Sequence, residues 1–336
     1  MRADASSPDS PRVVIVTPAL ADANNGNWQT ARRWQRFLSP VFPARVVRQW
    51  PDASARHDRI LLALHARRSA SSILAWSEAH PSRGLAVVLT GTDLYRDILT
   101  DAAAQRSIRL AQALVVLQER GPLALPAELR PKARVIYQST TMRRILPKPR
   151  RLLRAVMVGH LREEKSPETL FAAARILARH DDIRIDHVGA ALDAALGAAA
   201  RATMAECPNY RWLGGQPHEA TRRRIQRAHL LIHASRIEGG AHVVMEAVCS
   251  GTPVLASRID GNAGMLGQDY AGYFEWGNAR GLAELVLACR ADQGSGAGLL
   301  ARLARQCARR APLFAPAVEQ AAVRALVAQW GQFFTL

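Results

Sequence analysis

The stretch that decides the fold is residues 230–257, LLIHASRIEGGAHVVMEAVCSGTPVLAS. It opens with an apolar run at 230–234, which predicts a buried strand. A Glu-Gly-Gly turn follows, and apolar residues at helical spacing predict a helix over 241–250 that ends at a glycine. A second apolar strand is predicted at 253–257. Because a helix joins the two strands, we expect them to lie parallel in a sheet covered on both faces.

The same alternation of strand and helix runs outward from this unit along the whole chain. Before it, strands are predicted at 12–17, 59–64, 85–89, 113–117 and 134–137, with a possible sixth at 45–48, and helices at 27–38 and 69–79. Around it, strands are predicted at 154–158, 183–188 and 210–213, and helices at 167–179, 192–206, 217–227, 280–291, 299–311 and 317–334. This pattern indicates an α/β protein with parallel sheets.

The alternation breaks once, at residues 145–152, where two prolines and several basic residues predict a linker. We therefore expect two doubly wound, Rossmann-like domains, at 1–150 and 151–315, with a cleft between them. Residues 316–336 are expected to form a helix that could pack back on the first domain. Ligands of open parallel sheets bind beyond the carboxyl ends of the strands, so the loops there hold the candidate functional residues.

Composition excludes several classes of protein. With 336 residues, 49% of them apolar, the chain is long enough for two hydrophobic cores and too apolar to be disordered. No stretch of about 18 residues is apolar and free of charge, so no bilayer-spanning helix is expected. Residues 1–12 lack the apolar core of a signal peptide, and we expect a cytoplasmic protein. The four cysteines form no CxxC pair, so neither a zinc site nor a redox pair is expected.

The net charge of +17 points to anions only in part. Just three of the 45 basic residues are lysines, and such a bias toward arginine in an alanine-rich chain is typical of genome composition, with the arginines on solvated helix faces. The alternative is an anionic partner. No basic run interleaved with aromatic residues occurs, so we expect no nucleic-acid partner. The arginine-rich helices leave a membrane-surface role open, but no membrane partner is expected.

The turn at Glu238-Gly239-Gly240 carries the first functional motif. Glycines allow a ligand to approach the backbone closely, and the amides at a helix start suit a phosphate group. Glu246 follows Glu238 at an E-x7-E spacing, which gives one carboxylate on the turn and one on the helix. Carboxylates can accept hydrogen bonds from sugar hydroxyls. Two glutamates at this spacing are also compatible with ordinary surface charges, but the strand, turn and helix around them favour a site.

This motif resembles the nucleotide-sugar motif of the GT-B glycosyltransferases that include sucrose and glycogen synthases, and the segment 158–165, VGHLREEK, resembles their VGR-x(n)-K segment. The resemblance implies that Glu246 holds the ribose of the donor, that Glu238 contacts the donor sugar and that the Gly239 and Gly240 amides face the phosphates or the sugar. It also implies that Lys165 neutralises the diphosphate, which stabilises the leaving group. Lys165 and Glu238 are thus the candidate catalytic residues.

The chain departs from this family pattern at three places. His160 stands where the family has arginine, so either Arg162 or a protonated His160 could supply the charge of the donor site. The usual EGFG is EGGA, which removes an aromatic residue. Asp260-Gly261-Asn262 stands where the family often has two glycines and a glutamate. These departures leave the donor sugar and the stereochemical course open.

A second group of candidates follows the predicted strands of the first domain. Asn24, Asn25, Gly26 and Asn27 form a loop after the first strand, and asparagine and glycine adopt the left-handed conformations that turn amides toward an anion. After two later strands come His65, Arg67 and Arg68, and then Thr92 and Asp93. These residues are candidates for binding the acceptor, and arginines there would suit an anionic one. The alternative is a plain turn with surface arginines.

The segments TPALADANNGNWQTARRWQRFL, LLALHARRS and LTGTDLY resemble the selenosugar synthases of the selenoneine pathway, over residues 12–330. That resemblance implies transfer of a sugar from UDP-GlcNAc or UDP-glucose to selenophosphate, with release of UDP and phosphate. An anionic selenium nucleophile needs no general base, only cations to hold it, and Arg67, Arg68 and Arg32 are available. No metal-binding DxD motif occurs, so neither a metal nor another cofactor is expected.

Two other functions remain open at this point. One is an ordinary glycosyltransferase that uses another acceptor, and the other is a nucleotide-sugar-binding protein without transfer activity. The sequence does not choose the donor sugar or the oligomeric state.

Overall fold

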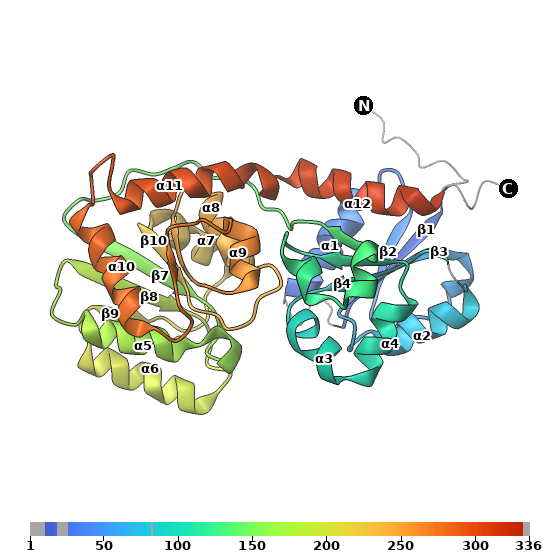
Figure 1. Cartoon of the computed structure of the whole chain (residues 1–336), viewed down its shortest axis with the longest axis horizontal. Helices are drawn as coiled ribbons and strands as arrows, with labels where there is room; N and C mark the ends of the chain where they lie inside the picture. Colours follow the sequence, from blue (N-terminus) through green and yellow to red (C-terminus); the bar gives the residue numbers. More distant parts are fainter. Residues whose placement is uncertain (1–10, 19–25, 82, 332–336) are drawn as a thin grey trace. The chain divides into compact units, whose positions relative to one another are not determined.

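The computed structural model of the chain describes residues 11–18, 26–81 and 83–331. The chain divides into two compact units (Figure 1). The first contains the N-terminal part through Ser139 together with the segment from Pro316 onward, and the second runs from Thr140 to Ala315. Each unit is built around one parallel sheet, which confirms the predicted α/β class with two Rossmann-like sheets.

The first sheet has the strand order β2-β1-β3-β4-β5-β6, and every neighbouring pair is parallel. Its strands are β1 (Arg12–Val16), β2 (Ala44–Val47), β3 (Asp58–Leu64), β4 (Leu85–Leu89), β5 (Ala113–Val116) and β6 (Ala133–Val135). Its helices are α1 (Gly26–Leu38), α2 (Ala70–Ala79), α3 (Ile98–Thr100), α4 (Ala102–Leu110) and α12 (Pro316–Gly331), with a π-helical turn at Asp93–Asp97 before α3. The central strands are buried on both faces because both faces of the sheet carry apolar clusters.

The last helix, α12, packs on the first unit, where one buried carboxylate anchors it. Glu319 is fully buried and accepts hydrogen bonds from the side chains of Arg33 and Trp34 on α1, at 2.6 and 2.7 Å, and from the backbone N–H of Ser139, at 2.8 Å. Apolar residues of α12, such as Val323 and Val327, join the cluster on this face of the sheet. Figure 1 shows α12 beside α1. The expected return of the C-terminal helix therefore has a specific polar anchor.

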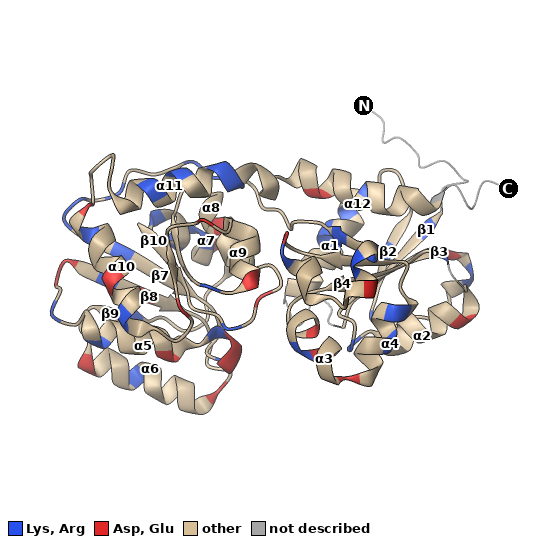
Figure 2. Ribbon diagram, viewed as in Figure 1, with Lys and Arg blue, Asp and Glu red and all other residues tan. Residues whose placement is uncertain are grey.

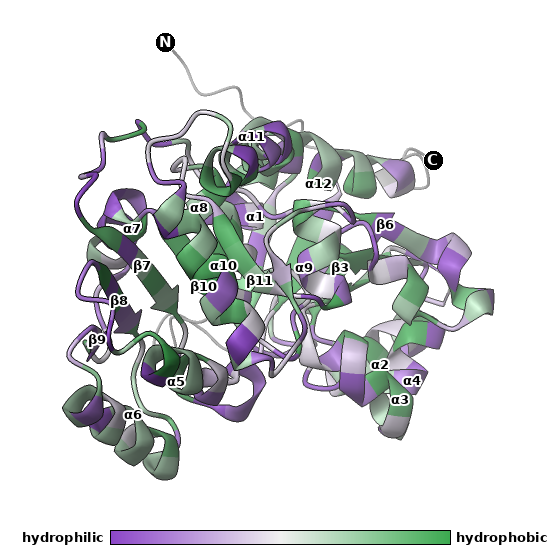
Figure 3. Cartoon of the chain, turned by 60° about the vertical axis from the view of Figure 1, so that its left-hand side comes forward, coloured by the Kyte–Doolittle hydropathy of each residue, from purple (hydrophilic) through white to green (hydrophobic). Residues whose placement is uncertain are grey.

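The second sheet has the order β12-β11-β10-β7-β8-β9 and is also parallel throughout. Its strands are β7 (Leu153–Val158), β8 (Ile183–Val188), β9 (Tyr210–Trp212), β10 (Leu230–His233), β11 (Val254–Ser257) and β12 (Tyr273–Phe274). Its helices are α5 (Pro167–Ile176), α6 (Ala194–Glu206), α7 (His218–Arg227), α8 (His242–Val248), α9 (Asp260–Leu266), α10 (Ala279–Ala291) and α11 (Leu299–Arg310). The hydrophobic colour of β7 and β10 contrasts with the mixed colours of the helices around them (Figure 3).

The boundary between the units lies before the linker that the sequence suggests. Residues 140–150 were expected in the first domain, but they run along the second unit. Arg143 donates its backbone N–H to the carbonyl of Cys249 at 2.8 Å, and Lys148 donates to the carbonyl of Gly251 at 3.2 Å. Hydrogen bonds from the backbone of Arg143 and the side chain of Lys148 therefore tie this segment to the second unit, and the boundary lies at Ser139. The prolines and basic residues alone suggested a later position.

Besides the three-residue helix α3, two helices were not predicted from the apolar periodicity, α4 and α9. The helix α4 buries only small or single residues, Ala104, Ser107 and Ile108, so its pattern is weak, although Asp101 caps it by accepting the N–H of Ala104. The helix α9 contains two glycines, which have low helix propensity. Tertiary contacts override propensity there, since every residue of α9 after Asp260 is buried.

Charges are dispersed over the described residues. Blue and red segments are spread over the helices and loops of each unit, with α11 as a helix that carries blue segments only (Figure 2), as expected for arginines on solvated helix faces. Within the described part of the chain, none of the helices combines the length and apolar character that crossing a bilayer demands.

Candidate functional site

The second sheet reverses its strand order between β7 and β10, which are paired although β8 and β9 lie between them in the chain. At such a switch point the loops beyond the carboxyl ends of the two strands diverge and leave room for a ligand. Residues 159–166 follow β7 and contain Lys165, and residues 234–241 follow β10 and contain Glu238. The fold therefore brings together two segments that lie far apart in the sequence and that both carry predicted donor residues.

Lys165 and Glu238 are in direct contact at this switch point. The Lys165 Nζ donates a hydrogen bond to Glu238 Oε1, and His233, the last residue of β10, lies with Nε2 3.4 Å from the same oxygen. Burial by itself would raise the pKa of Glu238, but the Lys165 ammonium and the His233 ring hold that pKa well below its usual range. Glu238 is therefore a carboxylate at neutral pH, which can accept hydrogen bonds but cannot act as an acid.

Glycines fix the backbone on which these side chains stand. A Cβ added to Gly261 at the start of α9 would lie 2.0 Å from the carbonyl oxygen of Glu238. A Cβ at Gly189 would lie 1.9 Å from the carbonyl oxygen of Gly159. Any side chain at either position would displace one of the two loops, because real carbon and oxygen atoms do not approach so closely. Gly261, where the sequence departs from the family pattern, is thus a packing position for the Glu238 turn.

The turn itself offers backbone donors. The N–H groups of Gly239 and Gly240 donate to no acceptor among the described residues, whereas the next N–H, of Ala241, points to the sulfur of Met265 at 3.1 Å. Two free amides beside an ionised glutamate are the arrangement expected for binding an oxygen-rich ligand. The helix that follows, α8, has only seven residues, so its dipole adds little beyond these amides.

Glu246 lies on α8 and is buried, with 4% of its surface exposed. His218 of α7 places Nε2 2.6 Å from Glu246 Oε1, and Arg222, one turn further along α7, places Nε 3.8 Å from it. The hydrogen bond to Glu246 raises the pKa of His218, with a further contribution from the charge of that carboxylate. The sequence did not indicate His218 or Arg222 as site residues, although their spacing of four puts them on one face of a helix.

The structure distinguishes between the two expected replacements for the missing arginine. His160 Nδ1 accepts the backbone N–H of Ala190 at 3.0 Å, and burial together with the charges of Arg162 and Lys165 lowers the pKa of His160. His160 is therefore neutral at neutral pH and does not replace a guanidinium. Arg162 is half-exposed, and among the described residues its one ion-pair partner is Glu164, with the Arg162 Nε 3.9 Å from the carboxylate.

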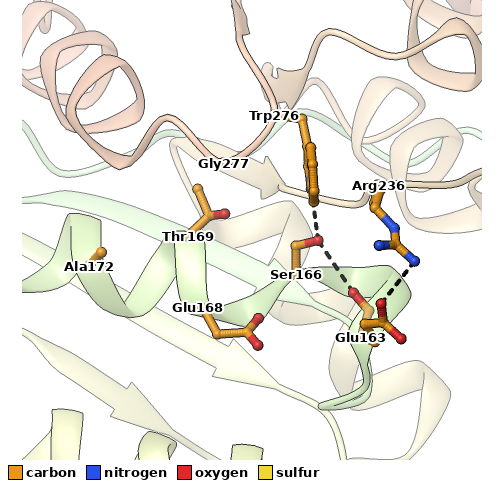
Figure 4. Close-up of a pocket in the computed structure, with 8 residues that line it drawn as sticks. All are labelled: Glu163, Ser166, Glu168, Thr169, Ala172, Arg236, Trp276 and Gly277. Carbon is orange, nitrogen blue, oxygen red and sulfur yellow. Dashed lines mark hydrogen bonds and ion pairs between the residues drawn. The ribbon is translucent and has the colours of Figure 1, made fainter.

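A hollow of about 380 Å³ lies next to the loop that carries Lys165 (Figure 4). The Trp276 Nε1 donates to the hydroxyl of Ser166 at 2.9 Å, and the Arg236 guanidinium lies over the Trp276 ring, 5.8 Å from its centroid. Arg236 also pairs with Glu163 at 2.9 Å. Ser166 has a left-handed φ of 46°, which is uncommon for a residue with a side chain. These contacts clamp the loop residues on both sides of Lys165.

In the first unit the expected acceptor residues divide into two kinds. Asp93 is fully buried, and its carboxylate accepts the backbone N–H groups of Thr90, Gly91 and Ala66 at 2.8, 3.0 and 3.0 Å. These bonds tie the loop after β4 to the loop after β3. We therefore correct the prediction for Asp93: both of its oxygens are occupied by backbone donors, so it holds the loops and does not face a ligand.

His65 and Thr92 lie together where these two loops meet. The Thr92 hydroxyl is 3.4 Å from His65 Nε2, and His65 has a left-handed φ of 75°. Burial lowers the pKa of His65, although the nearby Asp93 opposes this effect. Arg67 and Arg68 follow on the surface, where Arg67 places Nε 3.3 Å from Asp97.

The loop after β1 is described only at its end. Asn24 and Asn25 lie outside the described residues, while Gly26 and Asn27 open α1. Arg32 is exposed on the same helix, whereas the adjacent Arg33 is occupied by Glu319.

Two parallel α/β units, with Lys165 and Glu238 at the switch point of the second, have the architecture of a GT-B fold. A model of the family described as glycosyl transferases group 1 matches residues 138–309, just over half of the chain, and the chain belongs to this family. The matched segment contains both loops of the second switch point. No curated protein sequence matches the chain.

Solved structures of low sequence identity share the fold. Alr3699/HepE of Anabaena, in complex with UDP-glucose, has 14% identity and a TM-score of 0.71 over 95% of this chain and 99% of that one. The sucrose-phosphate synthase of Thermosynechococcus elongatus has 15% identity and a TM-score of 0.70 over 97% and 98%. TarM of S. aureus, in complex with UDP, has 13% identity and a TM-score of 0.58, and this chain, 82% of it aligned, spans only 55% of the TarM chain.

Proposed function

We propose that the protein transfers the sugar of UDP-GlcNAc or UDP-glucose to selenophosphate and so forms a 1-seleno sugar for selenoneine biosynthesis. The observation that carries the donor half is the Lys165–Glu238 pair at the switch point of the second sheet. The UDP-glucose complex of HepE and the UDP complex of TarM support a UDP-sugar donor. The acceptor half rests on the likeness of residues 17–38, 61–69 and 89–95 to selenosugar synthases.

The paired charges indicate how the donor is held. Lys165 is neutralised by Glu238 in the free protein, so a diphosphate has to take the ammonium over from the carboxylate. Glu238 then becomes free to accept a hydrogen bond from a hydroxyl of the donor sugar. The Gly239 and Gly240 amides supply further hydrogen-bond donors. Because Lys165 would face the charge that grows on the departing UDP, it stabilises the transition state more than the ground state. Glu246 accepts hydrogen bonds from the ribose hydroxyls, and Arg162 supplies the positive charge at the margin of the site, where His160 is neutral.

An anionic acceptor needs positively charged side chains to hold it and no general base to activate it. Selenium of selenophosphate attacks the anomeric carbon, the carbon–oxygen bond to UDP breaks, and the bonding electrons leave on the diphosphate. Water then cleaves the selenium–phosphorus bond and releases phosphate. Since the nucleophile is already anionic, a neutral His65 is no obstacle, and Thr92, Gly26 and Asn27 could orient the acceptor. Of the arginines expected to hold the acceptor, Arg68 and Arg32 remain available, whereas Arg67 forms an ion pair with Asp97.

Measuring UDP release also distinguishes the two alternative functions. A glycosyltransferase with a different acceptor would bind UDP-sugar but release no UDP in response to selenophosphate. A nucleotide-sugar-binding protein would bind the donor and release no UDP with any acceptor.

The deciding experiment mixes the full chain with UDP-GlcNAc or UDP-glucose, with and without selenophosphate, and detects UDP and a selenium-containing sugar by mass spectrometry. We expect selenium-dependent UDP release that the Lys165→Ala variant loses, and that persists in EDTA because no metal is expected to take part. Absence of selenium-dependent UDP release with any UDP-sugar would refute the selenophosphate assignment. If the protein still binds UDP in that case, the assignment of the UDP-sugar site is retained.

A further inference from the structure

A second hollow, of about 350 Å³, lies in the first unit. Of the candidate acceptor residues, Arg68 is the one that lines it. Its lining residues are Pro18, Arg48, Gln49, Arg68, Ser71 and Ser72. They come from three strand ends: Pro18 follows β1, Arg48 and Gln49 follow β2, and the others lie between β3 and the first turn of α2. The first sheet reverses its order between β1 and β3, so the hollow lies at the switch point of this sheet, where ligands bind.

The lining of this hollow is positive. Two of its residues are arginines and none is acidic. The Arg68 guanidinium forms no hydrogen bond or ion pair with any residue that the structure describes. The neighbouring arginines, by contrast, form ion pairs: Arg45 pairs with Asp52 and Asp58, and Arg67 pairs with Asp97. Among the described residues, Asp52, Asp58 and Asp97 are thus paired with other arginines, and the positive charge of Arg68 is left for a ligand.

The start of α2 adds neutral donors. This helix has ten residues, and the N–H groups of Ser71 and Ser72 in its first turn donate to no acceptor in the described part of the chain. Ser72 is buried, with 1% of its surface exposed, and its Oγ accepts the backbone N–H of Trp50 at 3.0 Å. That bond leaves the hydroxyl proton of Ser72 without an acceptor among the described residues. A buried donor that lines a cationic hollow indicates an anionic ligand.

We propose that this hollow binds a tetrahedral oxyanion, a phosphate or a phosphoryl group, through Arg48, Arg68 and the first turn of α2. Its identification as the acceptor's phosphoryl subsite rests on the proposed function, because selenophosphate carries such a group. Oxygen atoms of the anion accept hydrogen bonds from the guanidinium groups, the Ser72 hydroxyl and the two free amides. Selenium, a poorer acceptor than oxygen, is then the atom left to react. Phosphate, a product of the proposed reaction, fits the same subsite.

Inorganic phosphate is the probe for this subsite. Binding to the full chain is measured by isothermal titration calorimetry at low ionic strength, for the wild type and for the Arg68→Ala, Arg48→Ala and Arg106→Ala variants. Arg106 is an exposed arginine on α4 outside the hollow, so it controls for the loss of one positive charge. We expect Arg68→Ala and Arg48→Ala each to weaken phosphate binding about tenfold or more, and Arg106→Ala to leave it unchanged.

The outcomes separate this inference from the proposed function. The proposal is overturned if phosphate does not bind, if all three variants lose affinity equally, or if UDP displaces phosphate one for one, since the anion would then occupy a nucleotide site. In steady-state turnover, Arg68→Ala should raise the KM for selenophosphate and leave the KM for the UDP-sugar unchanged. Phosphate binding that depends on Arg68, in a protein that shows no transferase activity, would support the anion site and refute the proposed function alone.

Discussion

The two sheets use their buried carboxylates differently. In the second unit, Glu238 and Glu246 each touch few partners, a lysine and a histidine for one, a histidine and an arginine for the other. In the first unit, Asp93 and Glu319 are saturated by backbone and side-chain donors. A carboxylate whose oxygens are filled by the protein holds the fold together, whereas one with remaining acceptor capacity can exchange a partner for a ligand. Burial alone does not distinguish these two roles.

The largest expected effect tests the structural carboxylate. Glu319→Ala removes the partner of Arg33 and leaves the Trp34 and Ser139 donors buried without an acceptor. We expect the free energy of unfolding of the first unit to fall by about 3–5 kcal/mol, the usual cost of breaking a buried ion pair. Urea denaturation followed by tryptophan fluorescence measures it, and UDP affinity in the native baseline should be unchanged.

Glu78→Ala, a change of an exposed glutamate on α2, is the matched control, with an expected effect of about 0.5 kcal/mol or less. If both variants unfold at the same urea concentration, Glu319 does not anchor α12.

The second effect in size concerns Lys165. Lys165→Ala should lower kcat with a UDP-sugar by about tenfold or more, because the charge on the departing diphosphate is no longer balanced. Lys165→Arg should recover part of the loss. Arg175→Ala, which breaks a surface pair with Glu206, is the control and should leave kcat unchanged. Steady-state UDP release measures all three variants.

Glu246→Ala should act mainly on binding. The loss of the ribose acceptor is expected to raise the KM for the UDP-sugar and the Kd for UDP by about tenfold, while thermal unfolding shifts less than in Glu319→Ala. Calorimetric titration with UDP checks the affinity. Near-normal turnover in both Lys165→Ala and Glu246→Ala would remove the donor-site assignment, and a collapse of stability in Glu246→Ala would place this carboxylate with the structural ones.

The smallest expected effect is the pH dependence of the His218–Glu246 pair. The pKa of His218 is raised in the folded protein, so the pair contributes stability that is complete below the unfolded pKa of about 6.5 and is lost as the pH rises through the higher folded value. The difference in unfolding free energy between wild type and His218→Gln should therefore shrink from about pH 6 to about pH 9. Its size should stay under about 1 kcal/mol, since His218 is exposed to water. A difference that grows with pH would contradict this assignment.

Much of the fold follows from local sequence. Central strands such as β4 are continuous apolar runs, and β4 begins and ends at the expected residues because a strand buried on both faces tolerates little else. The strand β8 also has the expected bounds, although it contains Arg184, Asp186 and His187. The helix α9 could not be predicted, since Gly261 at its start is required by the carbonyl of Glu238, a contact between two segments that are separated in the sequence. The domain boundary was placed too late for the same reason, as hydrogen bonds to Cys249 and Gly251 hold the linker.

The candidate sites show the same limit. The sequence placed Lys165 and Glu238 in one site, and the structure brings them into contact. It could not distinguish Arg67 from Arg68, which are adjacent, because the difference is the position of Asp97 in the fold. It also favoured Asp93 as a ligand contact, since a polar residue beyond a strand has the same pattern whether it binds a ligand or the backbone. The assignment of each polar side chain depends on its partners.

The buried contact of Glu319 has a consequence for the order of folding during synthesis. Residues 140–315 are contiguous, so the second unit can fold as soon as they have left the ribosome. The first unit is started earlier but is completed later, because Trp34 and Ser139 must wait for a carboxylate that is made almost 300 residues after Trp34. Until then its sheet lacks the cover of α12 on one face. The nascent N-terminal half is thus the part of this protein most exposed to aggregation, and the part for which a chaperone would matter.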